Sequence, residues 1–317
     1  MHLPKYYAVL GKGDYLTIKE ERHGIWEYLE KQPSGWLCSI AVNRAIMPRD
    51  LPIFWDCGAV KYRNAEIPVS GKTLVTPAWA IAQYEKNFPK LGDLIAAPDH
   101  IFIPGSNLRF RRKFNWHSAE KFLTFAQQTL PECTPIAVTH GVTTQEKIET
   151  AHKLYELGYH AIAIGGMAFN ASDVKGNIAA VTAIRNCLPF NCYIHVLGLC
   201  SPTYAKAWSN LGVDSFDGSS YLLEAFKGRF YKANGGQITK HIAALPGCKI
   251  TIPLCYCHPC TQLRMSGIET RSSGSRNQNL SRAAHNLEQL LLAQTSVIIS
   301  ENREKEKQLL LSLKSCN

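Results

Sequence analysis

Residues 134–166, TPIAVTHGVTTQEKIETAHKLYELGYHAIAIGG, carry the pattern that decides the fold. A short apolar run, PIAVTHG, is followed by a polar stretch in which Ile148, Ala151 and Leu154 recur at helical spacing. A second apolar run, AIAIGG, follows directly. Because parallel strands need a crossover connection, a strand, a helix and a strand in this order indicate a parallel sheet.

The same alternation extends over most of the chain. The apolar runs PIFWD, LIAAPD, PIAVTHG, AIAIGG, IHVLG and VDSFD begin at about residue 53, and YYAVL and WLCSIAV could add two strands before them. About eight strand-helix units in about 220 residues predict an α/β fold, a (β/α)₈ barrel of the TIM type. A doubly wound sheet is the alternative, but no G-x-G-x-x-G sequence follows the first strand.

Residues able to do chemistry mark the C-terminal ends of these runs. They are Asp56, Asp99, His140, Gly165, Gly166 and Asp217. In a barrel, the C-terminal ends of all strands open at one mouth, where TIM-barrel enzymes have their active sites. We therefore expect residues far apart in the sequence to line one pocket.

The alternation stops after Asp217. Gly, Ser, Asn and Cys become frequent, and we interpret about residues 227–290 as a zinc-binding insertion packed on the barrel. One domain is then expected over residues 1–297, followed by a helical tail over 298–317. A helix is expected to resume with Ser281 as its N-cap.

A cluster of thiols in this insertion points to a metal. LCYCHPC contains Cys255, Cys257 and Cys260. An odd total of 11 cysteines, without a signal-like N-terminus, favours reduced thiols and a cytoplasmic location over disulfides. Candidates for a fourth ligand are His258, His285 and Cys248. Four protein ligands leave no open position, so a zinc ion here would be structural; the alternative is three free thiols in a loop.

The net charge of +10 favours a polyanionic partner such as nucleic acid. The segment RFRRKF combines cations with two aromatic rings, which could neutralise phosphates and stack on an unpaired base. Its cations are Arg109, Arg111, Arg112 and Lys113, and further candidates are Arg264, Arg271, Arg276 and Arg282. The alternative is an ordinary solvated loop. No stretch approaches the roughly 18 apolar residues of a membrane span, so no membrane partner is expected.

The thiol triplet and the histidine of HNL about 25 residues later resemble the zinc signature of the tRNA-guanine transglycosylases. Other segments follow in the order of that family. FWDCGAV resembles its D-S-G-G-F, AIGGMA its G-G-L-A, VLGLCSP its M-G-V-G-x-P, and GVDSFD its D-x-F-D. The resemblance implies a pentosyltransferase with a zinc site formed by Cys255, Cys257, Cys260 and His285.

The resemblance also assigns roles in base exchange. It implies that Asp217 attacks the sugar C1′ and that Asp56 is the general acid/base, a pair of roles that two carboxylates suit. Asp99 would accept from the N1-H and the amine of a guanine-like base. Backbone N-H groups over Gly165, Gly166 and Met167 would donate to O6, with Met167 and Leu197 packing on the ring. His140 stands where the family has glutamine, and either contacts the base or lines the pocket.

Three departures narrow the resemblance to one branch of this superfamily. DCGAVKY, THG and the segment after Asp217 differ from the family pattern, and the basic loop that members lay against tRNA is absent. This combination resembles the DpdA branch, which installs 7-deazaguanine bases in DNA. DNA and a 7-deazaguanine base are therefore the expected partners, with tRNA as the alternative. A non-catalytic zinc-bearing subunit is the third hypothesis, although it would need neither aspartate. Accessory proteins and a homodimer stay open.

Overall fold

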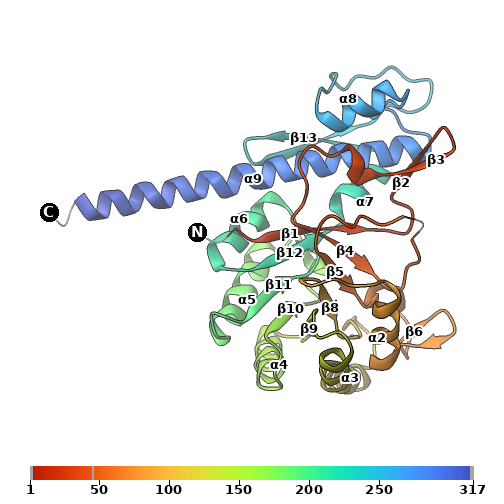
Figure 1. Ribbon diagram of the computed structural model, residues 1–317. Helices are drawn as coiled ribbons and strands as arrows, with labels where there is room; N and C mark the ends of the chain where they lie inside the picture. Colours follow the sequence, from red (N-terminus) through yellow and green to blue (C-terminus); the bar gives the residue numbers. More distant parts are fainter. Residues whose placement is uncertain (1–2, 45, 315–317) are drawn as a thin grey trace.

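A computed structural model describes residues 3–44 and 46–314, and its centre is a closed barrel of parallel strands (Figure 1). The strands are β1 (Lys5–Leu10), β4 (Gly35–Ser39), β5 (Ile53–Asp56), β8 (Leu94–Ala96), β9 (Thr134–Thr139), β10 (Ala161–Ile164), β11 (Tyr193–Val196) and β12 (Ser215–Gly218). Each pairs with the next in chain order, and β12 closes onto β1. The TIM-type barrel is confirmed, and each of the eight apolar runs supplies one strand.

Helices cover most of the outside of the barrel. They are α1 (Ala59–Tyr62), α2 (Pro77–Lys86), α3 (Leu108–Thr129), α4 (Thr144–Glu156), α5 (Val174–Cys187), α6 (Pro202–Leu211) and α7 (Ser220–Phe226). Short elements lie between them, namely β6 (Val69–Ser70), β7 (Thr73–Leu74) and the 3₁₀ helix η2 (Ala168–Asn170).

The first two connections differ from the expected strand-helix units. The chain from β1 to β4 passes through the hairpin β2 (Tyr15–Ile18) and β3 (Glu21–Gly24) and the 3₁₀ helix η1 (Ile25–Tyr28). Between β4 and β5 the described residues form no helix. The C-terminal helix α9 (Arg276–Lys314) packs against α6, α7, β2 and η1, so it covers this side instead (Figure 1).

Alternate side chains of the strands fill the barrel. Tyr7, Phe54 and Ile136 belong to one buried inner cluster. Because side chains two residues apart point to the same face of a strand, Asp56 points to the same side as Phe54. The alternation of side chains along β5 therefore points the Asp56 carboxylate into the C-terminal mouth of the barrel.

The C-terminal region adds a hairpin and two helices. The hairpin consists of β13 (Arg229–Asn234) and β14 (Gln237–Ile242), and α8 (His258–Met265) precedes α9. Helix α9 is continuous through residues 297 and 298, where the sequence suggested a boundary, and it extends beyond the barrel (Figure 1). The division into domains stays a prediction. No helix in the described ranges is both long enough and apolar enough to cross a membrane.

The expected N-cap at Ser281 is wrong. Helix α9 begins at Arg276, and the buried Ser281 hydroxyl donates to the Gln278 carbonyl within the helix. Ser275 caps the helix: its Oγ accepts from the Gln278 N-H, and the Gln278 side chain accepts from the Ser275 N-H, both at 3.1 Å. This reciprocal pair is a capping box, which lies six residues before the expected cap.

Candidate active site and metal centre

Asp56 ends strand β5 in an environment that favours its neutral form. Its Oδ2 accepts from the Gly58 N-H at 2.8 Å. Burial, followed by the nearby charges of Asp99 and, to a smaller extent, Asp217, raises the pKa of Asp56 to about 7. Because Asp99 and Asp217 both act on Asp56, the three carboxylates lie near one another at the C-terminal mouth of the barrel. Asp56 can therefore hold or release a proton near neutral pH, as a general acid/base requires.

Asp217, on strand β12, is 5% exposed and held through one oxygen. The Gly198 N-H donates to Oδ1 at 2.8 Å, and His195 Nε2 lies 3.1 Å from the same oxygen. Among the described residues, the hydrogen bonds to the Asp217 carboxylate all reach Oδ1. Oδ2 is consequently the oxygen left to meet a substrate, an arrangement suited to a carboxylate nucleophile.

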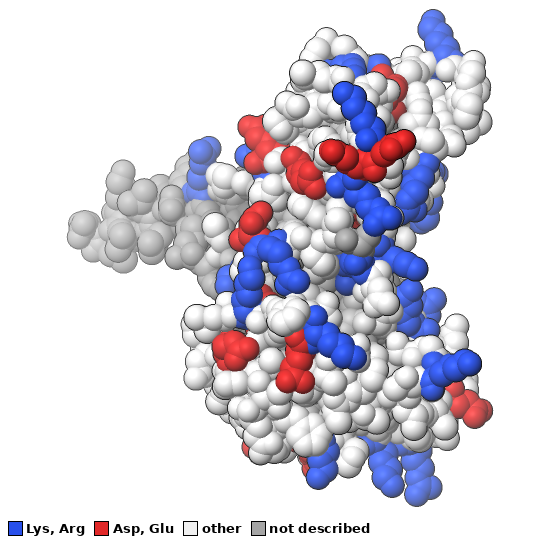
Figure 2. Space-filling view, turned by 45° about the vertical axis from the view of Figure 1, so that its right-hand side comes forward, with Lys and Arg blue, Asp and Glu red and all other residues white. Residues whose placement is uncertain are grey.

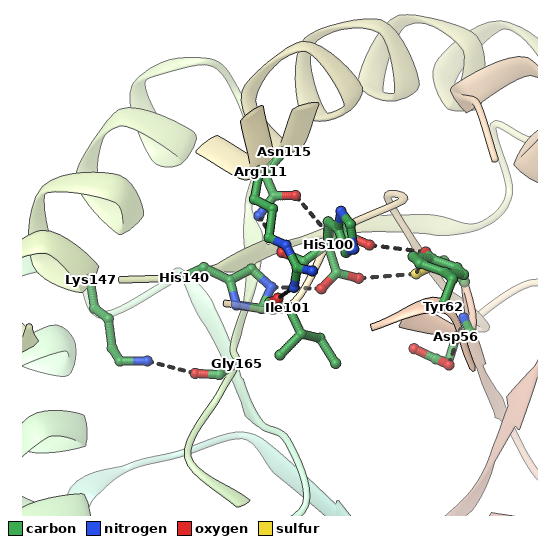
Figure 3. A network of polar contacts seen from close by, with 12 residues as sticks. Asp56, Tyr62, His100, Ile101, Arg111, Asn115, His140, Lys147 and Gly165 are labelled. Carbon is green, nitrogen blue, oxygen red and sulfur yellow. Dashed lines mark hydrogen bonds and ion pairs between the residues drawn. The ribbon is translucent and has the colours of Figure 1, made fainter. Parts of the chain in front are cut away.

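Asp99 follows strand β8 and is held on both oxygens. His140 Nε2 lies 2.6 Å from Oδ2, and the Cys57 thiol donates to Oδ1 at 3.0 Å. The Tyr62 hydroxyl donates to the Asp99 backbone carbonyl at 2.9 Å (Figure 3). Phe102 stacks on the His140 ring with centroids 5.4 Å apart. Each carboxylate oxygen keeps a further lone pair, so Asp99 could still accept from a base.

The Gly165–Gly166 turn lies against the His140 ring of the Asp99–His140 pair. A Cβ at Gly165 would come within 2.7 Å of the His140 ring, so only glycine fits there. The Lys147 ammonium group donates to the Gly165 carbonyl at 2.7 Å, and burial lowers the pKa of Lys147 (Figure 3). Met167 is buried beside the turn. The base-binding roles of the turn, Met167 and the half-buried Leu197 stay predictions.

A cavity of about 790 Å³ opens beside His140, between α3 and α4. Its walls include Phe102 and Trp116, and the Arg112 guanidinium lies over the Phe102 ring at 5.5 Å. Neither Asp56 nor Asp217 lines it. The cavity is therefore a neighbour of the carboxylate cluster, and its lining combines aromatic rings with both cationic and acidic side chains.

Four residues from the C-terminal region could hold a metal ion. The side-chain ligand atoms of Cys255, Cys257, Cys260 and His285 all lie within 4.8 Å of one another. His285 Nδ1 faces the three sulfurs, and its Nε2 lies 2.7 Å from the Tyr231 carbonyl. Donation by Nε2-H to this carbonyl leaves Nδ1 free as a ligand, a common second interaction of metal-bound histidines. The donor set suits a closed tetrahedral site, which fits structural zinc.

The alternative fourth ligands lie elsewhere. Cys248 is exposed, and neither it nor His258 belongs to the group of ligand atoms around His285. His285 also stacks on Phe230 with ring centroids 3.8 Å apart. The centre thus ties hairpin β13–β14, the thiol segment and helix α9 together.

Two of the expected nucleic-acid contacts are wrong. The Arg111 guanidinium is buried and donates to the backbone carbonyls of Ile101, Arg63 and Ala65. Arg282 is fully buried and donates to the Ala225 carbonyl and other backbone oxygens. Neither can reach a phosphate, because each charge is used inside the protein.

The other cations of RFRRKF do not lie in a loop but in the first turns of α3. Arg109, Arg112 and Lys113 are exposed, and Arg112 pairs with Glu146 at 2.6 Å. Their role as contacts stays a prediction. Of the later arginines, Arg271 pairs with Glu269 and Arg276 donates to the Gly13 carbonyl.

The sequence pattern missed several residues of the site. Cys57, Tyr62 and Lys147 gave no recognisable signal, because each acts through a fold-dependent contact. His195 did leave one, since it is a polar residue inside the apolar run IHVLG, two positions before Leu197. Its inward direction could have been read from the strand period.

The chain is similar in sequence to known proteins. A family model described as queuine tRNA-ribosyltransferase matches residues 112–291. The DNA-guanine transglycosylase of Salmonella montevideo is 26% identical over 196 residues, which cover 58% of this chain and 44% of that protein. The tRNA-guanine(15) transglycosylase of Korarchaeum cryptofilum (strain OPF8) is 24% identical over 135 residues, which cover 42% of this chain and 22% of that protein. The matched regions thus span less than half the length of these curated relatives.

Proposed function

Because the chain belongs to the queuine tRNA-ribosyltransferase family, we propose that it exchanges guanine in DNA for a 7-deazaguanine base, 7-cyano-7-deazaguanine or a derivative. The expected family membership and the likeness to the DpdA branch are confirmed by the family match and the DNA-guanine transglycosylase relative. The observation that carries the proposal is the contrast between two carboxylates of one mouth. Asp56 has a pKa raised to about 7, and Asp217 has two donors on one oxygen.

The first half of the proposed reaction removes guanine. Asp217 Oδ2 attacks C1′ of the deoxyribose, a C1′-O bond forms, and the C1′-N9 bond breaks with its electron pair passing to the base. The protonated Asp56 gives its proton to the departing guanine. A raised pKa serves this step, since an ordinary aspartate would hold almost no proton at neutral pH.

The second half inserts the new base. The ionised Asp56 takes the proton from N9 of the incoming 7-deazaguanine as N9 bonds to C1′. The ester bond breaks and its electron pair returns to Asp217, so the protein ends as it began. One carboxylate therefore handles the proton in both directions while the other carries the sugar.

The base subsite is proposed to use the Asp99–His140 pair and the Gly165–Gly166 turn. Asp99 is held on both oxygens by Cys57 and His140, so its orientation is set before a base arrives. Such preorganisation favours specific recognition, because the side chain pays little ordering entropy on binding. A Cβ at Gly165 would meet the His140 ring at 2.7 Å, so this glycine lets the turn pack closely against the Asp99–His140 pair.

A polyanionic substrate is supported by surface charge. Figure 2 brings forward the right-hand side of Figure 1. On this face, Lys and Arg side chains outnumber the acidic ones (Figure 2). Arg109, Arg112 and Lys113 are exposed on the first turns of α3, and Arg112 lines the cavity at His140. Because C1′ is inaccessible within a stacked duplex, the target nucleotide would have to be extruded.

The metal centre is proposed to hold zinc in a structural role. Cys255, Cys257, Cys260 and His285 would bind it, and four protein ligands leave it no open position for chemistry. Its proposed contribution is to fix the hairpin and the thiol segment onto α9.

One assay tests the proposed function. The protein is incubated with guanine-containing DNA and 7-cyano-7-deazaguanine, with and without candidate accessory proteins, and the DNA is digested to nucleosides for mass spectrometry. We expect the modified deoxynucleoside with the wild-type protein and none with Asp217→Ala, because the variant lacks the attacking oxygen. Failure of the wild-type protein on DNA and tRNA alike, under all these conditions, would overturn the proposal.

The same assay separates DNA from tRNA. The family description and the archaeal relative, named a tRNA-guanine(15) transglycosylase, favour tRNA as the second candidate substrate. Offering both polymers in one tube decides between them, and a modified nucleoside from tRNA alone would replace the DNA proposal. Nucleic acid binding by Asp217→Ala without turnover by the wild type would instead support a non-catalytic subunit.

A further inference from the structure

We infer that His195 is a positioning residue that presents Oδ2 of Asp217 to the sugar, acting through a buried chain of Ser215, His195 and Asp217. The inference rests on the proposed function, in which Asp217 is the nucleophile. Ser215 Oγ lies 2.7 Å from His195 Nδ1, and His195 Nε2 lies 3.1 Å from Asp217 Oδ1. Strand register sets up this chain, because His195 of β11 pairs directly with Ser215 of β12.

The partners determine where the proton of the imidazole lies. An ionised carboxylate can only accept, so Nε2 must carry the hydrogen that reaches Asp217. In a neutral ring Nδ1 is then an acceptor, and the Ser215 hydroxyl can donate to it. Ser215 thereby fixes the tautomer that His195 needs, a role often given to the partner of the second ring nitrogen.

The ring itself has little freedom to move. His195 is 0% exposed, with the Phe54 ring edge-on at a centroid distance of 4.6 Å and the Tyr7 ring at 6.0 Å. The Gly198 N-H adds a second donor to the same Asp217 oxygen. Two donors on Oδ1 fix the rotation of the carboxylate about its Cβ-Cγ bond, so Oδ2 is held in one direction. Nucleophilic attack depends steeply on such alignment.

A hydroxyl, an imidazole and a carboxylate also form the chain used by serine hydrolases, but here only the carboxylate end can react. Ser215 is 0% exposed inside the barrel, whereas Asp217 retains 5% exposure at the mouth. A substrate cannot reach the hydroxyl. The chain therefore orients the carboxylate as the nucleophile instead of activating the serine.

The kinetic test compares two substitutions at His195. His195→Phe removes the donor to Asp217. It should lower the single-turnover rate at which the Asp217–DNA adduct forms by roughly 10- to 100-fold, with little change in KM for the base. The adduct is trapped and measured on a denaturing gel. His195→Gln keeps an N-H donor and should recover part of the rate. His152→Gln is the matched control, because His152 is exposed on α4 and its substitution should leave the adduct rate unchanged.

A structural readout keeps the inference testable apart from activity. Nitrogen-15 NMR of the wild-type protein should show a protected Nε2-H signal that disappears in His195→Gln and shifts in Asp217→Ala. A ring protonated only at Nδ1, or wild-type adduct rates in His195→Phe, would overturn the role of His195. Absence of any base exchange by the wild type would instead overturn the proposed function, and the two failures are distinguishable.

Discussion

Three aspartates of one barrel mouth have three environments, and the difference comes from their immediate partners. Asp217 receives donors from Gly198 and His195, and Asp99 is paired with His140 and Cys57. Asp56 has one backbone donor and lies near the other two charges, which together with burial raise its pKa to about 7. Environments that separate the behaviour of neighbouring carboxylates are the usual basis for dividing acid/base and nucleophilic work between them.

The raised pKa of Asp56 predicts a stability cost that grows with pH. The folded protein binds this proton more tightly than the unfolded chain, so the free energy of unfolding falls as pH rises from about 4 to about 7. Asp56→Asn removes the charge and should stabilise the protein at pH 8 by at most about 4 kcal/mol, since each pKa unit corresponds to about 1.4 kcal/mol. The difference should shrink towards pH 4 in thermal melts across this range.

Asp50→Asn provides the control for this titration. Asp50 is exposed, so its substitution should change stability little and without a trend in pH. Asp56→Asn should also abolish base exchange, because the amide cannot carry the proton. Equal melting temperatures of Asp56→Asn and wild type at pH 8 would contradict the raised pKa.

At the scale of single elements, helix α9 shows what local chemistry decides. The expected cap at Ser281 fitted the start of the apolar pattern, but the helix begins where Ser275 and Gln278 can satisfy each other's backbone groups. The sequence SRNQ, residues 275–278, contains the S-x-x-Q pattern that is typical of a capping box. Capping chemistry outweighed hydrophobic periodicity here, since the first turn of a helix leaves backbone N-H groups unpaired.

The capping box predicts unequal effects of two serine substitutions. Ser275→Ala should lower the free energy of unfolding by about 1 kcal/mol, because it exposes a backbone donor at the helix start. Ser281→Ala should change it by less than about 0.5 kcal/mol, because alanine suits a helix interior and the Gln278 carbonyl keeps its position in the helix. Urea unfolding monitored by circular dichroism measures both, and equal losses would argue against Ser275 as the cap.

At the scale of the whole molecule, the metal centre joins parts that are distant in the chain. Cys257→Ala should lose the metal and lower the free energy of unfolding by several kcal/mol, because binding energy at a structural zinc site is folding energy. Cys248→Ala should keep metal and stability, since this exposed thiol lies outside the cluster. Metal analysis and thermal melts of both variants check this. An intact Cys257→Ala protein with unchanged metal content would exclude the assigned ligand set.

The arrangement of α9 is also a property of the whole molecule. The first two barrel connections lack α-helices in the part of the chain that the structure describes, and α9 packs against β2 and η1 on that side. Nothing in the composition of α9 identifies its partner, because an amphipathic helix can cover any apolar surface of suitable size. Which surface it covers depends on where the barrel leaves one open.

The sequence by itself determined the eight barrel strands, the mouth that receives Asp56 and Asp217, and the cluster of three thiols, whereas His285 was implied by the resemblance to a known family. These follow from short-range rules: apolar runs, a side-chain period of two and ligand spacing act within a few residues. Only the tertiary structure decided that Arg111 and Arg282 are buried, that Cys57 and His140 hold Asp99, and that His195 supports Asp217. Such contacts join residues from different strands and helices, so their distances exist only once the barrel has closed.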